Sequence, residues 1–250
     1  ELRGSTLSLA TLLFAAGIDP DRAILFVQSH VPQHMELAWY LNCTATFGEL
    51  RRMTQFKDKS GGQESVSVGL FDYPVLMASD ILLYDTDEAP VGDDQRQHVE
   101  LTRDIAIRFN HRFGDTFVVP KAVLPPVGAR IMDLQIPTRK MSKSEDSPQG
   151  TVLVLDDPKR IAKKIKSAVT DSDTEIRYDV AEKPGVSNLL DLYAAVTGAS
   201  LEQAQDTFAG QQYGTLKVQV ADAVVESLRP VQERYAALAA DPGEVDRILA

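Results

Sequence analysis

The chain has 250 residues, of which 44% are hydrophobic and 25% are charged, so it can form one large domain or two modest ones. Its formal net charge of -10 excludes indiscriminate binding of DNA, and its longest weakly polar stretch, residues 7–18, is too short to span a membrane. The single cysteine, Cys43, cannot form an internal disulfide, which indicates a cytoplasmic protein, and we expect its thiol to be buried as packing.

The front of the chain predicts helices around one buried strand. A helix is expected from Thr6 to Ala16, and the apolar run from Ile24 to Val27 is typical of a strand buried on both faces of a parallel sheet. Residues 33–56 predict helix, interrupted near Gly48, and an exposed turn follows from Lys57 to Gly62.

The next segment predicts a helix, a strand and a second helix. Asp72 can cap a helix that ends near Leu83, with a proline in its first turn. Residues 89–92 then form a short strand, and a helix is expected from Asp93 to Phe109. A strand that ends in a glycine at a helix N-terminus is how parallel sheets bind nucleotides, so Gly92 marks a candidate nucleotide site.

The second half of the chain predicts helices. Pro158 begins an amphipathic helix with Ile161 and Ile165 on its inner face and its lysines outside. Further helices are expected over residues 186–196, 201–208 and 218–239. We therefore expect an α/β domain over residues 1–154 and an all-helical domain over residues 155–250.

One short segment combines charge with hydroxyl groups. It consists of Lys140, Met141, Ser142, Lys143 and Ser144, and neighbouring prolines and a glycine place it on a surface loop. Its ammonium groups suit a polyphosphate and can supply positive charge during phosphoryl or nucleotidyl transfer. A solvated basic loop is the alternative interpretation for any lysine pair. Residues 139–168 carry a net charge of +4, and this basic strip predicts a phosphate-rich partner bound at one place.

This lysine segment looks like the second ATP signature of class I aminoacyl-tRNA synthetases. Four more segments resemble the bacterial tryptophanyl-tRNA synthetases, namely residues 53–59, 73–84, 90–104 and 128–132, and the similarity covers essentially the whole chain. The resemblance implies a Rossmann-type parallel-sheet catalytic domain with a dimerising insertion, followed by a helical domain on the anticodon side of the tRNA. That family has a first ATP signature N-terminal to the matched region, so we expect the chain to be part of a longer protein.

The resemblance also implies an activity. Enzymes of this family activate tryptophan with ATP to tryptophanyl-adenylate and then transfer it to tRNA(Trp), with Mg²⁺ carried on the phosphates and no metal site in the protein. A homodimer is implied, with the second subunit near residues 38–71. Two alternatives remain open: a synthetase-like regulator that binds nucleotide or RNA, and the tyrosine-specific sister enzyme.

The implied tryptophan site lies on one helix face. Tyr73, Met77 and Asp80 have the spacing that places them on the same side of a helix. By resemblance, Asp80 accepts the indole N-H while Tyr73 and Met77 pack around the ring, and Gln95 and Gln55 contact the amino acid. A tyrosine hydroxyl both donates and accepts, and Met77 offers nothing to the second role.

The implied ATP site combines the glycine turn with the lysine segment. Gly92 allows close approach of the backbone to the nucleotide, and Asp94 contacts the ribose region or a network around Lys59. Lys59, Lys140 and Lys143 are the implied catalytic residues. The other ATP-binding residues that the resemblance implies are Asp93, Ile131, Met141, Ser142 and Ser144.

Overall fold

The computed structural model describes residues 2–61, 65–124, 131–142 and 147–249, without the side chain of Lys59. By their contacts, residues 27–125 form one compact unit, and residues 1–26 with 126–250 form another. The boundary expected near residue 154 falls inside the second unit. The assignment of a catalytic domain and a tRNA-side domain stays a prediction.

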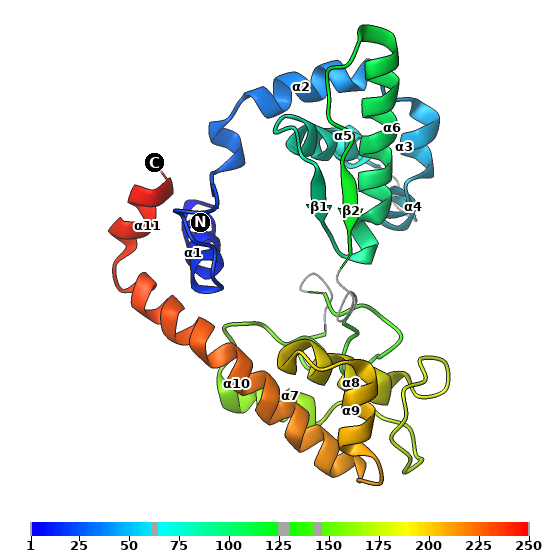
Figure 1. Cartoon of the computed structure of the whole chain (residues 1–250), viewed down its shortest axis with the longest axis vertical. Coiled ribbons are helices and arrows are strands. Elements are labelled where there is room, and N and C mark those ends of the chain that lie inside the picture. Colours follow the sequence, from blue (N-terminus) through cyan, green and yellow to red (C-terminus); the bar gives the residue numbers. More distant parts are fainter. Residues whose placement is uncertain (1, 62–64, 125–130, 143–146, 250) are drawn as a thin grey trace. The chain divides into compact units, whose positions relative to one another are not determined.

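The unit of residues 27–125 combines helices with a parallel pair of strands (Figure 1). Strand β1 (Glu88–Pro90) pairs with β2 (Lys121–Val123), with Ala89 opposite Ala122. Helix α5 packs against α2 and α6, and the core between them includes Leu41 and Val75. The unit's helices are α2 (Gln33–Asn42), α3 (Phe47–Arg52), α4 (Thr54–Ser60), α5 (Val68–Leu82) and α6 (Arg96–Phe113), with short 3₁₀ turns η1 (Gln28–His30) and η2 (Asp93–Gln95). The predicted α/β class with a parallel sheet is confirmed.

The strand predicted from Ile24 to Val27 is wrong. Within the described ranges this segment pairs with no strand, and the side chain of Ile24 is 91% exposed. A continuous apolar run gives only a preference for extended backbone, whereas a strand also needs a neighbour to which its N-H and C=O groups can bond.

Other element boundaries also differ from the predictions. The helix expected over residues 33–56 stops before Thr46, whose side chain caps α3 through a reciprocal pair with Glu49. The turn expected from Lys57 is helical as far as Ser60. Helix α5 begins at Val68 instead of near Asp72, because Ser67 caps it. Cys43 is exposed, not buried.

The other unit is helical around its own core (Figure 1). Helix α7 begins at Pro158 as predicted, with Asp157 accepting from the N-H groups of its first turn. Helix α10 packs against α1, α7 and α8, and the core includes Phe208 and Leu216. The unit's helices are α1 (Leu2–Ala15), α7 (Pro158–Lys166), α8 (Pro184–Thr197), α9 (Leu201–Phe208), α10 (Tyr213–Ala239) and α11 (Pro242–Leu249), the last of which lies in the region 155–250 that was expected to be helical. Among the described residues, no helix has the length and apolar character to cross a membrane.

Candidate functional site

Helix α5 has one packed face and one partly open face. Val75 and Ala78 are fully buried in the core. Tyr73, Met77 and Asp80 are only half-buried. The three side chains predicted to hold an aromatic amino acid therefore stand apart from the core packing of the same helix, as a binding face requires.

Asp80 has two polar neighbours that the sequence analysis missed, of which one is hydrogen-bonded to it. Nε2 of Gln28 donates to Oδ1 and Oδ2 of Asp80, at 2.8 and 2.9 Å. Nε2 of His34 lies 3.9 Å from Oδ1 of Asp80 and 2.9 Å from the hydroxyl of Tyr84. A neutral amide that bonds both oxygens orients the carboxylate and leaves its negative charge in place. The Asp80 side chain is 35% exposed, so it can still accept from a ligand.

Tyr73 links the predicted residue Gln55 to a buried histidine. Its hydroxyl lies 2.8 Å from Nε2 of His98 and 3.5 Å from Oε1 of Gln55. His98 belongs to α6 and is 1% exposed. Burial raises the pKa of Tyr73, so its hydroxyl is neutral at physiological pH. The structure thus brings together Gln55 of α4 and Tyr73 of α5, two residues that the resemblance assigned to the tryptophan site.

Gly92 stands at the carboxyl end of β1. The N-H of Val91 still pairs with the C=O of Val123 at 3.0 Å, and the C=O of Gly92 accepts from the N-H of Gln95 at 2.9 Å. Nε2 of Gln95 donates to Oδ2 of Asp94 at 2.9 Å. Asp93 forms an exposed ion pair with Arg96 at 3.7 Å. The predicted order of strand, glycine and helical turn is confirmed, and the ligand contacts of these residues stay predictions.

The first part of the lysine segment belongs to a hairpin in the other unit. Met132 pairs with Lys140 in an antiparallel bridge. The N-H of Met141 donates to the C=O of Ile131 at 2.9 Å. The structure therefore places Ile131 beside Met141, two residues that the resemblance assigned to the ATP site. Lys143, Ser144 and the side chain of Lys59 lie outside the described residues.

Two contacts fix the backbone on either side of the lysine segment. Oγ1 of Thr151 donates to the C=O of Ser142 at 3.2 Å. Asp133 approaches Gly150 so closely that a Cβ atom there would lie 1.9 Å from its Oδ1, so only glycine fits. Burial opposes ionisation of Asp133, but hydrogen bonds from Ser147 and two backbone N-H groups hold the pKa of its carboxyl below the usual value.

One lysine of α7 is buried, which corrects the prediction that its lysines lie outside. The side chain of Lys164 is 3% exposed, and its Nζ donates to Oδ2 of Asp156 at 2.7 Å and to the C=O of Thr151 at 2.6 Å. Position 164 lies on the same side of the helix as Ile161, three residues earlier. Asp156 supplies the opposite charge that a buried ammonium needs.

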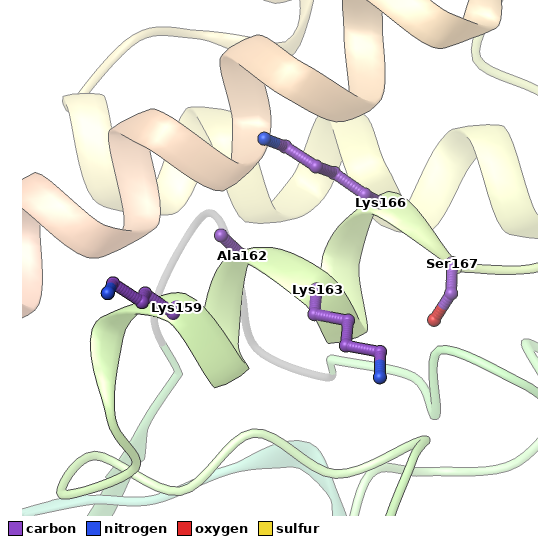
Figure 2. Close-up of a pocket in the computed structure, with 5 residues that line it drawn as sticks. All are labelled: Lys159, Ala162, Lys163, Lys166 and Ser167. Carbon is purple, nitrogen blue, oxygen red and sulfur yellow. The ribbon is translucent and has the colours of Figure 1, made fainter.

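The other lysines of this helix are exposed. Lys159, Lys163 and Lys166 line a surface hollow of about 520 Å³ together with Ala162 and Ser167. Figure 2 shows the three lysines distributed along α7. The basic strip predicted from the sequence therefore presents positive charge to solvent through these three lysines and through the exposed Arg139 and Arg160, without Lys164.

Comparisons with known proteins agree with this arrangement. The chain matches the family of class I tRNA synthetases (W and Y) over residues 1–229. It is 54% identical over 252 residues to tryptophan–tRNA ligase 2 of Streptomyces avermitilis, and the alignment covers 100% of this chain and 75% of that protein. It is 55% identical over 249 residues to the tryptophan–tRNA ligase of Oceanobacillus iheyensis, and the alignment covers 100% of this chain and 76% of that protein.

Solved structures show the same relationship. The tryptophanyl-tRNA synthetase of Mycoplasma pneumoniae has a TM-score of 0.92 and 36% identity, covering 99% of this chain and 76% of that one. The enzyme of Campylobacter jejuni, complexed with ADP and tryptophan, has a TM-score of 0.73 and 35% identity, and the match again covers 99% of this chain and 76% of that one. The chain therefore belongs to the class I tRNA synthetases (W and Y), and within them to the family of bacterial tryptophan–tRNA ligases.

Proposed function

We propose that the protein is a tryptophan–tRNA ligase, which activates tryptophan with ATP and transfers it to tRNA(Trp). The observation that carries the proposal is the open face of α5, where Asp80 is oriented by Gln28 beside Tyr73 and Met77. An indole has one N-H donor and no acceptor, so a single fixed carboxylate among packing groups satisfies it. The relatives at 54% and 55% identity are named for the same activity, which supports the proposal.

The same face disfavours tyrosine as substrate. A phenol hydroxyl needs an acceptor and also a donor, and a binding site that leaves one of these groups unpaired loses affinity. Met77 donates no hydrogen bond, and the amide of Gln28 already donates to both oxygens of Asp80.

The first reaction step needs alignment more than proton transfer. The carboxylate of tryptophan is already an anion and attacks the α-phosphate of ATP, while pyrophosphate leaves. We assign the stabilisation of charge on the phosphates to Lys59, Lys140 and Lys143. The nucleotide itself is assigned to Gly92, Asp93, Asp94, Ile131, Met141, Ser142 and Ser144, and the amino acid also to Gln55 and Gln95.

Mg²⁺ enters this scheme with ATP as part of the substrate. In the described part of the chain, no group of three or more His, Cys, Asp and Glu residues could hold a metal ion. The residues assigned to the phosphates are ammonium and hydroxyl groups, which suit phosphate oxygens. These groups are compatible with a magnesium ion that is coordinated by the phosphates of ATP and by several water molecules.

We also propose a homodimer in the cytoplasm. Within residues 38–71, the large apolar side chains Trp39, Phe47 and Val68 are 70%, 70% and 78% exposed. Several exposed side chains of this size in one segment are typical of a protein interface. The cytoplasmic location is supported by the single, exposed cysteine, which suits a reducing compartment.

The decisive experiment is ATP–pyrophosphate exchange with protein expressed from the full reading frame. We expect exchange that depends on tryptophan, and charging of tRNA(Trp) in a second assay. Tyrosine should support exchange at least about a hundredfold more weakly, as expected when a polar group must be matched. Exchange driven equally by tyrosine, or binding of nucleotide without any exchange, would refute the assignment.

A further inference from the structure

A buried asparagine holds the hairpin that leads to the lysine segment. Asn188 lies in α8 and is 2% exposed. Its Oδ1 accepts from the N-H of Met132 at 2.8 Å, and its Nδ2 donates to the C=O of Met132 at 2.9 Å. One side-chain amide therefore satisfies both backbone polar groups of a residue that is 56 positions away in sequence.

The pairing of the hairpin explains why Met132 needs this partner. Met132 faces Lys140, while the hydrogen bonds between the two arms are made by neighbouring residues, from Asp133 to Arg139 and from Met141 to Ile131. At such a non-hydrogen-bonded pair, the N-H and C=O groups of each residue point away from the opposite arm. Asn188 thus takes the place of a third strand at the outer edge of the hairpin.

The anchor is rigid because α8 belongs to the helical core. Val186, Leu189 and Leu190 in the same helix are fully buried. Because the amide of Asn188 is fixed, its bonds to Met132 also fix the hairpin arm that faces Lys140. If water bonded Met132 instead, that arm could shift. Because charge stabilisation depends on donor placement, a small shift of Lys140 would weaken it.

We propose that Asn188 is a positioning residue for adenylate formation, acting through Met132 on Lys140. The inference rests on the proposed function, in which Lys140 faces the phosphates. Asn188 itself contacts backbone and not substrate, so it is not a catalytic residue. No local pattern marked this residue, since an asparagine inside an apolar helix is equally compatible with a hydrogen bond to its own helix.

The test compares Asn188→Leu and Asn188→Asp with the unchanged enzyme in tryptophan-dependent pyrophosphate exchange. Leucine keeps the approximate shape and removes both bonds, while aspartate keeps the acceptor and places an oxygen against the C=O of Met132. We expect kcat to fall about tenfold or more in both variants, the size that two lost hydrogen bonds can produce. The KM and the dissociation constant for tryptophan should stay within about twofold, a small free-energy change, because Asp80 and Tyr73 belong to the other unit.

A matched control is available in Asn110. Its Nδ2 donates to the C=O of Phe117 at 2.8 Å and its Oδ1 accepts from the N-H groups of Thr116 and Phe117, which is the same kind of clamp in the unit that does not contain the lysine segment. Asn110→Leu should lower the melting temperature and leave the exchange kcat within about twofold, since it removes stability alone.

Two results would overturn the inference. One is an exchange kcat at the unchanged level in folded Asn188→Leu and Asn188→Asp. The other is a parallel loss of kcat and tryptophan affinity that tracks the melting temperature and also appears in Asn110→Leu. If Asn188→Leu does not fold, Asn188→Asp decides. Absence of tryptophan-dependent exchange in the unchanged enzyme would instead refute the proposed function.

Discussion

The side-chain amide of Gln28 bonds both carboxylate oxygens of Asp80, at 2.8 and 2.9 Å. The two residues are 52 positions apart, and the contact fixes the plane of the carboxylate on the open face of α5. A carboxylate that is oriented before the ligand arrives loses little conformational entropy on binding. We therefore propose that Gln28 supports Asp80 in selecting tryptophan, a role that the resemblance assigned to Asp80.

Asp80→Ala should lower kcat/KM for tryptophan by at least about tenfold, because a hydrogen bond to a charged group contributes roughly 1.5–3 kcal/mol. Discrimination against tyrosine and phenylalanine should weaken as well. The measurement is pyrophosphate exchange with each amino acid. Asp72→Ala is the matched control, since Asp72 lies on the same helix and accepts from Nδ2 of Asn42 at 3.1 Å. Normal tryptophan kinetics in Asp80→Ala would contradict the assignment.

Several local patterns predicted local structure correctly. Asp157 caps a helix with proline in its first turn, and Gly92 joins a strand to a helical turn, as their sequence neighbours indicated. Such signals depend on backbone groups within a few residues, so they do not need tertiary information. The residues of the Tyr73, Met77 and Asp80 face follow from helical spacing for the same reason.

Long-range partners were not predictable. The bonds from Gln28 to Asp80 and from Asn188 to Met132 join positions more than fifty residues apart, and neither polar side chain carries a local signature. Lys164 was wrongly predicted to be exposed. The pattern of lysines shows where positive charge lies, but it does not show that Asp156 supplies the negative charge that allows one lysine to be buried. The run from Ile24 to Val27 shows the same limit, since a strand depends on a neighbour.

Lys140→Ala and Lys143→Ala should each lower tryptophan-dependent pyrophosphate exchange by about 10²- to 10³-fold, the usual loss for one transition-state contact. The dissociation constant for tryptophan should stay within about threefold, since these lysines act on the phosphates. Both quantities are measured on one preparation. Lys166→Ala, which removes an exposed lysine of α7, is the control. If both variants exchange pyrophosphate at the unchanged rate, the segment is a solvated basic loop without a catalytic role.

The exposed lysines of α7 should bind tRNA phosphates. Changing Lys159, Lys163 and Lys166 to glutamine should weaken tRNA binding and reduce the slope of log affinity against log salt by about 0.7–0.9 for each lost contact. Filter binding at several salt concentrations gives this slope. Pyrophosphate exchange needs no tRNA and should survive. Equal losses in exchange and in tRNA binding would indicate a different role for this surface.

The exposed apolar side chains of α2 and α3 should form a subunit interface. Trp39→Glu and Phe47→Glu together should shift the protein from dimer to monomer, because each places a charge where apolar contact is needed. Sedimentation velocity over a concentration series measures the shift. Val218→Glu, at an apolar side chain of α10 that is 41% exposed, should leave the dimer intact. A monomeric unchanged protein would refute the proposed interface.

Lys164→Met should destabilise the helical unit in a pH-dependent way. Burial disfavours the charge of Asp156, but hydrogen bonds from Lys164 and from the N-H of Leu153 outweigh it and hold the pKa of Asp156 below the usual value. A carboxyl with a lowered pKa stabilises the fold above its unfolded pKa, and this contribution disappears as pH falls through the folded value. At neutral pH the variant leaves Asp156 charged and without its buried partner, which costs about 3–5 kcal/mol.

Urea unfolding of the unchanged protein and of Lys164→Met, followed by circular dichroism, measures this difference. It should be largest near about pH 7 and shrink toward about pH 4, because protonation of Asp156 removes the charge that has lost its buried partner in the variant. Lys163→Met replaces the adjacent, exposed lysine and should change the free energy of unfolding by less than about 0.5 kcal/mol at either pH. A loss in Lys164→Met that is equal at both pH values would mean that the hydrogen bond from Lys164 to the C=O of Thr151, and not the pairing with Asp156, carries the stability.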